Sequence, residues 1–517
     1  MFRLRRILTA AIFTGIVSAA SIAANNTITY NGNLIHVSGD TILLDREGIF
    51  GCNEALKDPI QAFDKVNSIG SKAVLLVAPS VYWLDDPEDP EVRVDKRGTP
   101  FAVRLTCDTL SIIGLADNPE DVVFAVERGQ TQGAVGNYTM FSFSGKSLET
   151  QNITFGNYCN VDLVYPRNPE LNRLKRRSAI VQAQIGICNG TDRLFAENCR
   201  FISRLNLCPF VGARRSLYDN CYFECTDDAL SGSAVYLDCR FTFFSSKPFY
   251  STDETGAVFL NCDITYLGSG VQYFTKVPGM VTAVDTRFHS EKPIEIKWTR
   301  DPSDIICLQE NISLNGQPYI IDADRTHLWH SLETDSIRNA YVLDYDGRKV
   351  YNLSNLLNDD DGWDPLSMNT PIDRISRKEG KPMTGLPVAM RVKKISPALI
   401  SDGDTVRFIF TPLLWGGRVA GEDVIMDCVA HNDKPESQTT CVVTKPYQGV
   451  SSHASFTVAP NLRKAPKFKR RPKVRYDESE GCFRVDYTLS GKGKDESEII
   501  WGRVVSDSAS PSIMVVR

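Results

Sequence analysis

A cysteine-centred motif recurs four times in the middle of this 517-residue chain and constrains its fold more than any other feature. The motif reads AENCRF, YDNCYF, YLDCRF and FLNCDI, around Cys199, Cys221, Cys239 and Cys262. An Asn or Asp precedes each cysteine, and the intervals are 22, 18 and 23 residues. A regular period of this length indicates one supersecondary unit per repeat, with each unit stacked on its neighbours.

The segments between the motifs predict short strands rather than helices. Their residues alternate in polarity and are rich in β-formers, and their apolar runs are too short for β-α units. The pattern predicts an all-β parallel β-helix, in which each coil adds one rung to a shared interior. Upstream, residues 58–83 indicate a helix and a buried strand, and residues 105–124 indicate a pair of strands. We therefore expect the β-helix to span residues 45–315.

The four repeated cysteines have two possible roles. Recurring once per coil, they would stack as small hydrophobic residues inside the β-helix, which is the interpretation we favour. Disulfides are the alternative, because the chain has 14 cysteines and an export signal. Cys221 and Cys225 form a CxxxC, but no second cysteine pair or histidine cluster completes a metal site, so we expect none.

The N-terminus is typical of a secretory signal peptide, which we place at residues 1–24. Three arginines precede an apolar run from Ile7 to Val17, and small residues follow. That run is too short to span a bilayer. We expect an exported monomer without a membrane span, in the periplasm, at the cell surface or secreted. A net charge of -5 does not favour nucleic acid as a partner.

The order of features over roughly residues 45–300 resembles the pectin methylesterase (pectinesterase) family. VAPSVYW stands where that family has a strand ending in Pro-Gly-Thr-Tyr, VQAQIG leads to an Asn-Cys-x-Phe coil, and RSLYDNC matches an Arg-x-x-Tyr-x-x-Cys segment. Seven residues after Cys221, DALSG (Asp228 to Gly232) stands where the family has Asp-Phe-Ile-Phe-Gly. The resemblance implies a right-handed parallel β-helix of the pectin-lyase-like type.

The resemblance also implies a chemistry. In that family the Asp of this segment is a nucleophile, which attacks the methyl ester of a galacturonate and releases methanol through an acyl-enzyme. Asp228 matches this nucleophile, and Gln182 matches a glutamine that stabilises the oxyanion. Asn206 stands where a second such glutamine is expected and can still donate a hydrogen bond. The implied partner is a pectic polysaccharide, and no cofactor is implied.

Two positions depart from the family pattern. Leu207 stands where the general acid and base is expected, and Ser269 where an arginine positions the nucleophile. Positioned proton transfer contributes about 10²–10⁴-fold, so a site without the acid is expected to be slower. Arg215 and Lys276 are the candidates to supply positive charge and to bind an acidic substrate.

Each of these assignments has an alternative. Asp228 could cap backbone N–H groups in a turn of the β-helix, and Gln182 could belong to a stacked amide ladder. Asp227 is expected to face the interior or a turn, because adjacent strand residues point to opposite faces. For the whole chain, the alternatives are a β-helix that binds pectic polysaccharide without catalysis, and a polysaccharide lyase.

The remaining residues predict a different organisation. Residues 316–385 read as an irregular connecting segment, in which the acidic loop at Asp359 and Asp361 could bind Ca²⁺ or form a tight turn. Residues 386–462 alternate like the strands of an immunoglobulin-like β-sandwich. Residues 463–517 begin with a basic linker and continue into what we predict as part of a second sandwich.

Overall fold

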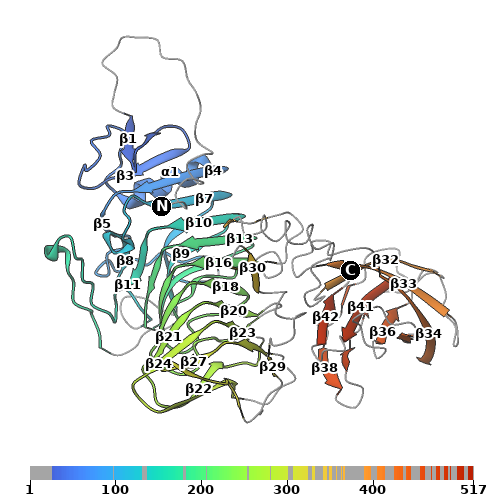
Figure 1. The fold of residues 1–517 in the computed structure, drawn as a ribbon. Helices are drawn as coiled ribbons and strands as arrows, with labels where there is room; N and C mark the ends of the chain where they lie inside the picture. The colour runs from blue at the N-terminus through green and yellow to red at the C-terminus, as the bar shows by residue number, and fades with distance from the viewer. Residues whose placement is uncertain are drawn as a thin grey trace.

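The computed structural model describes residues 26–96, 98–130, 137–178, 182–204, 206–252, 256–279, 281–300 and 307–323. Beyond these it describes mainly short strands between residues 329 and 515. The predicted signal peptide at residues 1–24 lies outside the described residues. Figure 1 shows that the first part of the chain winds as a stack of parallel strands, which forms a parallel β-helix.

Three sheets run along the β-helix, and most coils contribute one strand to the first sheet and one to the second. The first sheet has eleven strands: β3 (Thr41–Leu44), β4 (Lys72–Val77), β7 (Thr109–Gly114), β10 (Ser147–Gln151), β13 (Arg193–Glu197), β16 (Arg215–Asp219), β18 (Ala234–Leu237), β20 (Ala257–Leu260), β23 (Val281–Val284), β26 (Cys307–Glu310) and β29 (Trp329–Ser331).

The second sheet has ten strands, of which the last two pair antiparallel. Its strands are β5 (Ser80–Trp83), β8 (Val122–Val126), β11 (Thr154–Asn157), β14 (Arg200–Ile202), β17 (Tyr222–Cys225), β19 (Arg240–Phe243), β21 (Asp263–Tyr266), β24 (Arg287–Ser290), β27 (Ser313–Leu314) and β28 (Gln317–Pro318).

The third sheet is less regular, and we call it the third row. It starts with β6 (Phe101–Leu105), β9 (Tyr138–Phe143), β12 (Ala183–Cys188) and β15 (Pro209–Val211), and it ends with β22 (Gly270–Thr275) and β25 (Ile294–Thr299). Isolated bridges from Leu230 to Phe249 and from Phe249 to Thr275 join its two halves. The third row therefore continues through coils that form no regular strand in it.

Stacked aromatic rings fill the interior of the β-helix. Phe155, Phe201, Phe223 and Phe241 come from successive coils of the second sheet, with ring centroids 5.6, 5.1 and 4.7 Å apart. All four side chains are buried. Each buried Phe stabilises the fold by about 1.5–3 kcal/mol relative to an exposed one.

The repeated cysteines also lie in this interior, as the favoured interpretation predicted. Cys199, Cys221, Cys239 and Cys262 are at most 1% exposed, and none forms a disulfide. The Cys239 thiol donates to the carbonyl oxygen of Leu237 at 3.3 Å. Burial raises the pKa of Cys239 well above its ordinary value, so this thiol stays protonated and unreactive.

The Asn or Asp before each cysteine makes the bend between the first and second sheets. Its backbone is left-handed, with φ between 50° and 53° at Asn198, Asn220, Asp238 and Asn261, and the equivalent bends of other coils have the same conformation at Asn152, Asp285 and Asn311. Asn and Asp adopt this conformation more readily than other residues with a side chain. The repeated motif therefore combines a bend and an interior side chain in two adjacent positions.

The N-terminal end of the β-helix carries the predicted helix. This is α1 (Pro59–Ile69), which begins at Asp58, whose carboxylate accepts the N–H of Ile60 at 2.8 Å. A hairpin of β1 (Thr27–Tyr30) and β2 (Asn33–His36) precedes it. Two short 3₁₀ helices, η3 (Pro119–Asp121) and η4 (Pro169–Leu171), lie in later connections. No helix of the described residues is long and apolar enough to cross a membrane.

The segment after the β-helix folds back onto it. Strands β30 (Val342–Tyr345) and β31 (Arg348–Tyr351) form an antiparallel hairpin. The Tyr351 hydroxyl donates to Asp285 Oδ2 at 3.2 Å, so the hairpin lies against the bends between the first and second sheets. The predicted calcium loop at Asp359 and Asp361 lies outside the described residues.

The C-terminal region contains antiparallel β-structure. Seven strands form one sheet: β32 (Ala389–Ser396), β33 (Thr405–Leu413), β34 (Val424–Lys434), β35 (Gln438–Val443), β36 (Ser455–Ala459), β41 (Glu498–Val505) and β42 (Pro511–Val515). Two shorter pairs are β37 (Lys467–Phe468) with β40 (Leu489–Ser490), and β38 (Lys473–Asp477) with β39 (Cys482–Asp486). Strands on both sides of residue 463 share the larger sheet; the immunoglobulin-like type and the division at 463 stay predictions.

Candidate functional site

Asp228 lies on the third row, in a turn between β17 and β18. The Cys208 N–H donates to the Ala229 carbonyl at 2.7 Å, and the Leu230 N–H donates to the Pro248 carbonyl at 2.9 Å. These bonds make residues 228–230 the rung that follows β15. The sequence left two interpretations of Asp228, a nucleophile facing a groove or a residue in a turn; the structure puts it in a turn and leaves its carboxylate half-buried.

The backbone of Asp228 is left-handed, with a φ of 55°. Its N–H donates to the carbonyl oxygen of Lys247 in the next coil at 3.0 Å. Because strand alternation stops at such a residue, the expected opposite facing of Asp227 and Asp228 does not follow here. Both side chains are half-buried and both lie in the turn. A turn was one of the two predicted environments of Asp227.

Lys276 is the cation that holds Asp228. Its Nζ lies 2.6 Å from Asp228 Oδ2, and the two side chains are 42% and 22% exposed. Lys276 follows β22, two coils beyond Asp228, and its own N–H donates to the Phe249 carbonyl. The hydrogen bond to Asp228 raises the pKa of Lys276 above its ordinary value. Lys276 therefore supplies the positive charge that Ser269 does not.

One oxygen of Asp228 is held and the other is not. Lys276 takes Oδ2, while Asp228 Oδ1 is buried and has no hydrogen-bond donor among the described residues. A buried carboxylate oxygen without a donor is costly, and such groups concentrate at functional sites. The arrangement gives a carboxylate that one cation orients and whose remaining acceptor capacity is unused.

Tyr250 adds an exposed aromatic ring beside this ion pair, and sequence reasoning missed it. The ring is 50% exposed, and Lys276 Nζ lies 5.9 Å from its centroid. The next coil brings Val277, 41% exposed, whose N–H donates to the Tyr250 carbonyl at 2.9 Å. An aromatic ring with a polar tip suits a surface that is apolar and wet at once. The only signal in the sequence was an aromatic residue after the buried Phe249.

The coil before Asp228 carries Asn206 and Leu207. Leu207 is fully buried in the core, so it presents no group to the surface. Asn206 is half-buried and left-handed, with a φ of 47°. Cys208 follows, and burial, with a smaller contribution from the Asp228 charge, raises its pKa to about 12. The structure thus puts an amide and a protonated thiol, and no carboxylic acid, at residues 206–208.

Gln182 lies two coils before Asp228, immediately before β12. Its carbonyl oxygen accepts the N–H of Gln130 at 3.0 Å, and its side chain is half-buried. Gln182, Asn206 and Asp228 therefore occupy successive coils of the third row. Their catalytic roles stay predictions.

Arg215 lies on a different sheet from Asp228. It belongs to β16 of the first sheet, is 3% exposed, and places Nη2 2.6 Å from Asp192 Oδ2. Its guanidinium also lies 5.3 Å from the ring centroid of Trp363. Burial pushes the pKa of Asp192 up, but the hydrogen bonds from Arg215 and Arg214 outweigh it, and the pKa is lowered. The structure brings Lys276 to Asp228, but not Arg215.

The part of the chain that the structure describes contains no group of three or more His, Cys, Asp or Glu side chains placed to hold a metal ion. Two charged groups lie beside Asp228: Lys276, its ion-pair partner, and the neighbouring Asp227, whose charge also acts on Lys276. What the site offers chemically is a carboxylate nucleophile or ligand, a cation and an exposed aromatic ring.

Comparison with known proteins gives structural similarities only. No model of a protein family matches the chain, and no curated protein matches it. A pectin methylesterase from carrot is similar at 10% identity and a TM-score of 0.36, covering 62% of this chain and 91% of that one. A pectin methylesterase from Aspergillus niger, in deglycosylated form, has 15% identity and a TM-score of 0.37, covering 56% and 93%. Escherichia coli ybhC has 13% identity and a TM-score of 0.36, covering 63% and 88%.

Proposed function

We propose that this chain is a carbohydrate esterase that removes methyl esters from galacturonate units of pectin, with Asp228 as its nucleophile. The observation that carries the proposal is the ion pair between Asp228 and Lys276, because it orients a partly exposed carboxylate on the outer surface of the β-helix. The predicted family supplies this cation from the position of Ser269. In this chain a lysine seven residues later has the same partner.

The chemistry proceeds in two steps. An oxygen of Asp228 attacks the ester carbonyl carbon, the bond to the methoxy oxygen breaks, and the departing group leaves as methanol with a proton from water. Water then attacks the acyl-enzyme, which releases the free acid of the sugar and restores the Asp228 carboxylate. Asn206 and Gln182 are the proposed donors to the oxyanion that forms in each step.

The surface around the ion pair suits an acidic sugar polymer. The exposed ring of Tyr250 offers an apolar face to a sugar ring, and Lys276 offers a positive charge to a uronate carboxylate. The proposal includes export of the protein, with residues 1–24 as its signal peptide, because pectic polysaccharide is an extracellular polymer.

Methanol release from highly methylated pectin tests the proposal. We compare the wild type with Asp228→Asn and with Asp227→Asn, which removes the same charge from the adjacent residue of the same turn. The Asp228 variant is expected to lose at least about 10³-fold in rate, while the Asp227 variant stays within about tenfold of the wild type. Equal release by all three proteins would sink Asp228 as nucleophile.

A second candidate is a β-helix that binds pectic polysaccharide without hydrolysing it. The burial of Leu207 favours it, because the position of the expected acid is turned into the core. This candidate predicts retained binding of polygalacturonate with no methanol release from methylated pectin. The same experiment therefore separates the two functions.

The lyase alternative is disfavoured by the charge state of Lys276. A lyase on this fold needs a neutral lysine or arginine to take a proton from the sugar. The hydrogen bond to Asp228 raises the pKa of Lys276, which keeps it protonated in neutral solution. Absence of ultraviolet-absorbing unsaturated products from polygalacturonate is the expected result.

A further inference from the structure

The outer face of the third row changes character along its length. Beyond Asp228, towards the C-terminal coils, its side chains are open to solvent: Tyr250 is 50% exposed, Val271 39% and Val277 41%. Before Asp228, Met140 on β9 and Ile185 on β12 are fully buried. The two halves of the row therefore cannot offer the same surface to a ligand.

Met140 and Ile185 are buried although they point away from the interior of the β-helix. Phe141 points inward, because its ring meets Phe63 and Phe155 at 5.3 and 5.9 Å. Gly186 also faces inward, because a Cβ placed there would lie 2.6 Å from the Phe210 ring. Since adjacent strand residues face opposite sides, Met140 and Ile185 face outward. Something outside the β-helix must cover them.

The connection between β5 and β6 lies against the first strands of the third row, and we call it the strap (residues 84–96). Arg93 donates to the carbonyl oxygen of Ala102 on β6, and Val92 packs against the buried core of the β-helix. Tyr138, on the outward face of β9, donates its hydroxyl hydrogen to Asp85. The strap thus lies over the start of the third row.

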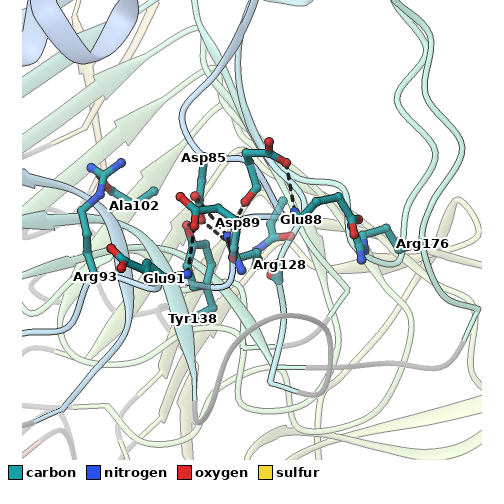
Figure 2. A network of polar contacts seen from close by, with 11 residues as sticks. Asp85, Glu88, Asp89, Glu91, Arg93, Ala102, Arg128, Tyr138 and Arg176 are labelled. Carbon is teal, nitrogen blue, oxygen red and sulfur yellow. Dashed lines mark hydrogen bonds and ion pairs between the residues drawn. The ribbon is translucent and has the colours of Figure 1, made fainter.

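Arg128 fixes the strap in place. Its side chain is 1% exposed, its Nε lies 2.6 Å from Asp85 Oδ2, and its Nη2 donates to the carbonyl oxygens of Asp86 and, at 2.8 Å, Asp89. Figure 2 shows these groups converging on the arginine, together with the ion pair from Glu88 to Arg176 at 2.5 Å. Because a buried guanidinium needs these acceptors, the contacts anchor the strap to the body of the β-helix.

We propose that the strap closes the site on its N-terminal side, so that the third row binds the end of a polyuronate chain, or a short oligosaccharide, and not the interior of a long chain. The rung of β9, whose Tyr138 meets the strap, lies three rungs before Asp228, which leaves about 14 Å of row between the strap and the nucleophile. One direction remains open, past Tyr250 and Val277. This inference rests on the proposed function and adds the position along the polymer at which the site acts.

Binding at chain ends has a measurable signature. We measure the binding of polygalacturonate to Asp228→Asn, at constant mass of sugar, before and after mild acid has shortened the chains about tenfold. At low occupancy a site for chain ends binds about ten times more, because the molar concentration of ends rises tenfold. A site for chain interiors binds the same amount at equal mass, and this result would overturn the inference.

A variant of the strap supplies the matched comparison. Replacing residues 87–91 with two glycines removes Glu88 and Asp89 but keeps Asp85, Arg128 and Val92. We expect the ratio of binding after and before shortening to fall from about ten towards one. If this variant fails to fold, as judged by circular dichroism, the inference is tested by Asp228→Asn with the native strap, through the ratio of its binding to shortened and to long polygalacturonate. No binding of either length would instead count against the proposed function, so the two failures are distinguishable.

Discussion

Replacing Lys276 with methionine separates the role of this residue in catalysis from its role in stability. The ion pair to Asp228 is short, at 2.6 Å, but its lysine is 42% exposed. Pairs with this exposure contribute about 0.2–1 kcal/mol, because solvent screens the attraction and both side chains lose freedom. We therefore expect Lys276→Met to lower the free energy of unfolding by less than about 1 kcal/mol.

The effect on the rate is expected to be much larger. Lys276 holds Asp228 Oδ2, so its removal frees the nucleophile to rotate and takes away a positive charge at the reacting carboxylate. Loss of one preorganised electrostatic contact at such a site costs about 10²–10³-fold, or about 2.7–4 kcal/mol of transition-state stabilisation. Methanol release and urea unfolding, measured on the same preparation, give the two numbers.

Lys247→Met is the matched control. Lys247 lies in the coil next to Asp228, and replacing it with methionine removes the same charge as Lys276→Met. The Lys247 side chain forms no ion pair with the described residues. The control is expected to keep its rate within about threefold, and Lys276→Arg is expected to recover part of the activity. If Lys276→Met is no slower than Lys247→Met, the ion pair does not orient the nucleophile and the reasoning fails.

Three further predictions concern the coil before Asp228 and the interior. Asn206→Asp is expected to lower methanol release about 10²–10³-fold, because it replaces a proposed oxyanion donor with a negatively charged acceptor. Leu207→Asp instead buries a carboxyl group and is expected to lose about 3 kcal/mol or more of stability; a rate of Asn206→Asp equal to that of the wild type would contradict the proposed role of Asn206. Phe223→Ala, in the aromatic stack, is expected to cost about 3–5 kcal/mol in urea unfolding, and a loss below about 1 kcal/mol would contradict the packing. Cys221 and Cys239 are expected to react with a thiol reagent only after unfolding, and rapid labelling of the native protein would show the interior to be open.

The repeated motif predicted the β-helix because it encodes two local requirements. The Asn or Asp takes a left-handed backbone at the bend, and the cysteine that follows packs inside, as at Asn220 and Cys221. Both requirements act within two residues, so a single chain displays them directly. The interior packing of the cysteines, favoured over disulfides, follows from the same spacing.

The site was less predictable because it depends on contacts between coils. Asp228 could be placed from its offset to Cys221, but its partner Lys276 is 48 residues away in the sequence. Arg215 seemed an equal candidate, yet it lies on the first sheet and is engaged by Asp192. The irregular third row decides which basic side chain reaches Asp228. Its left-handed residues interrupt the alternation of side chains between the two faces of a strand, and the prediction of their directions depended on that alternation.

Leu207 stands where the family pattern predicts the general acid, and its burial limits where an acid could act in this coil. Because this residue is fully buried, no acid at position 207 could reach the surface unless the local backbone changed. Asn206 and Cys208 are then the positions of this coil nearest to Asp228 that could present a proton donor, and burial keeps the pKa of Cys208 near 12. An acid in this coil would have to stand at 206, in place of the amide that is the proposed oxyanion donor, so the coil could gain the one role only by losing the other.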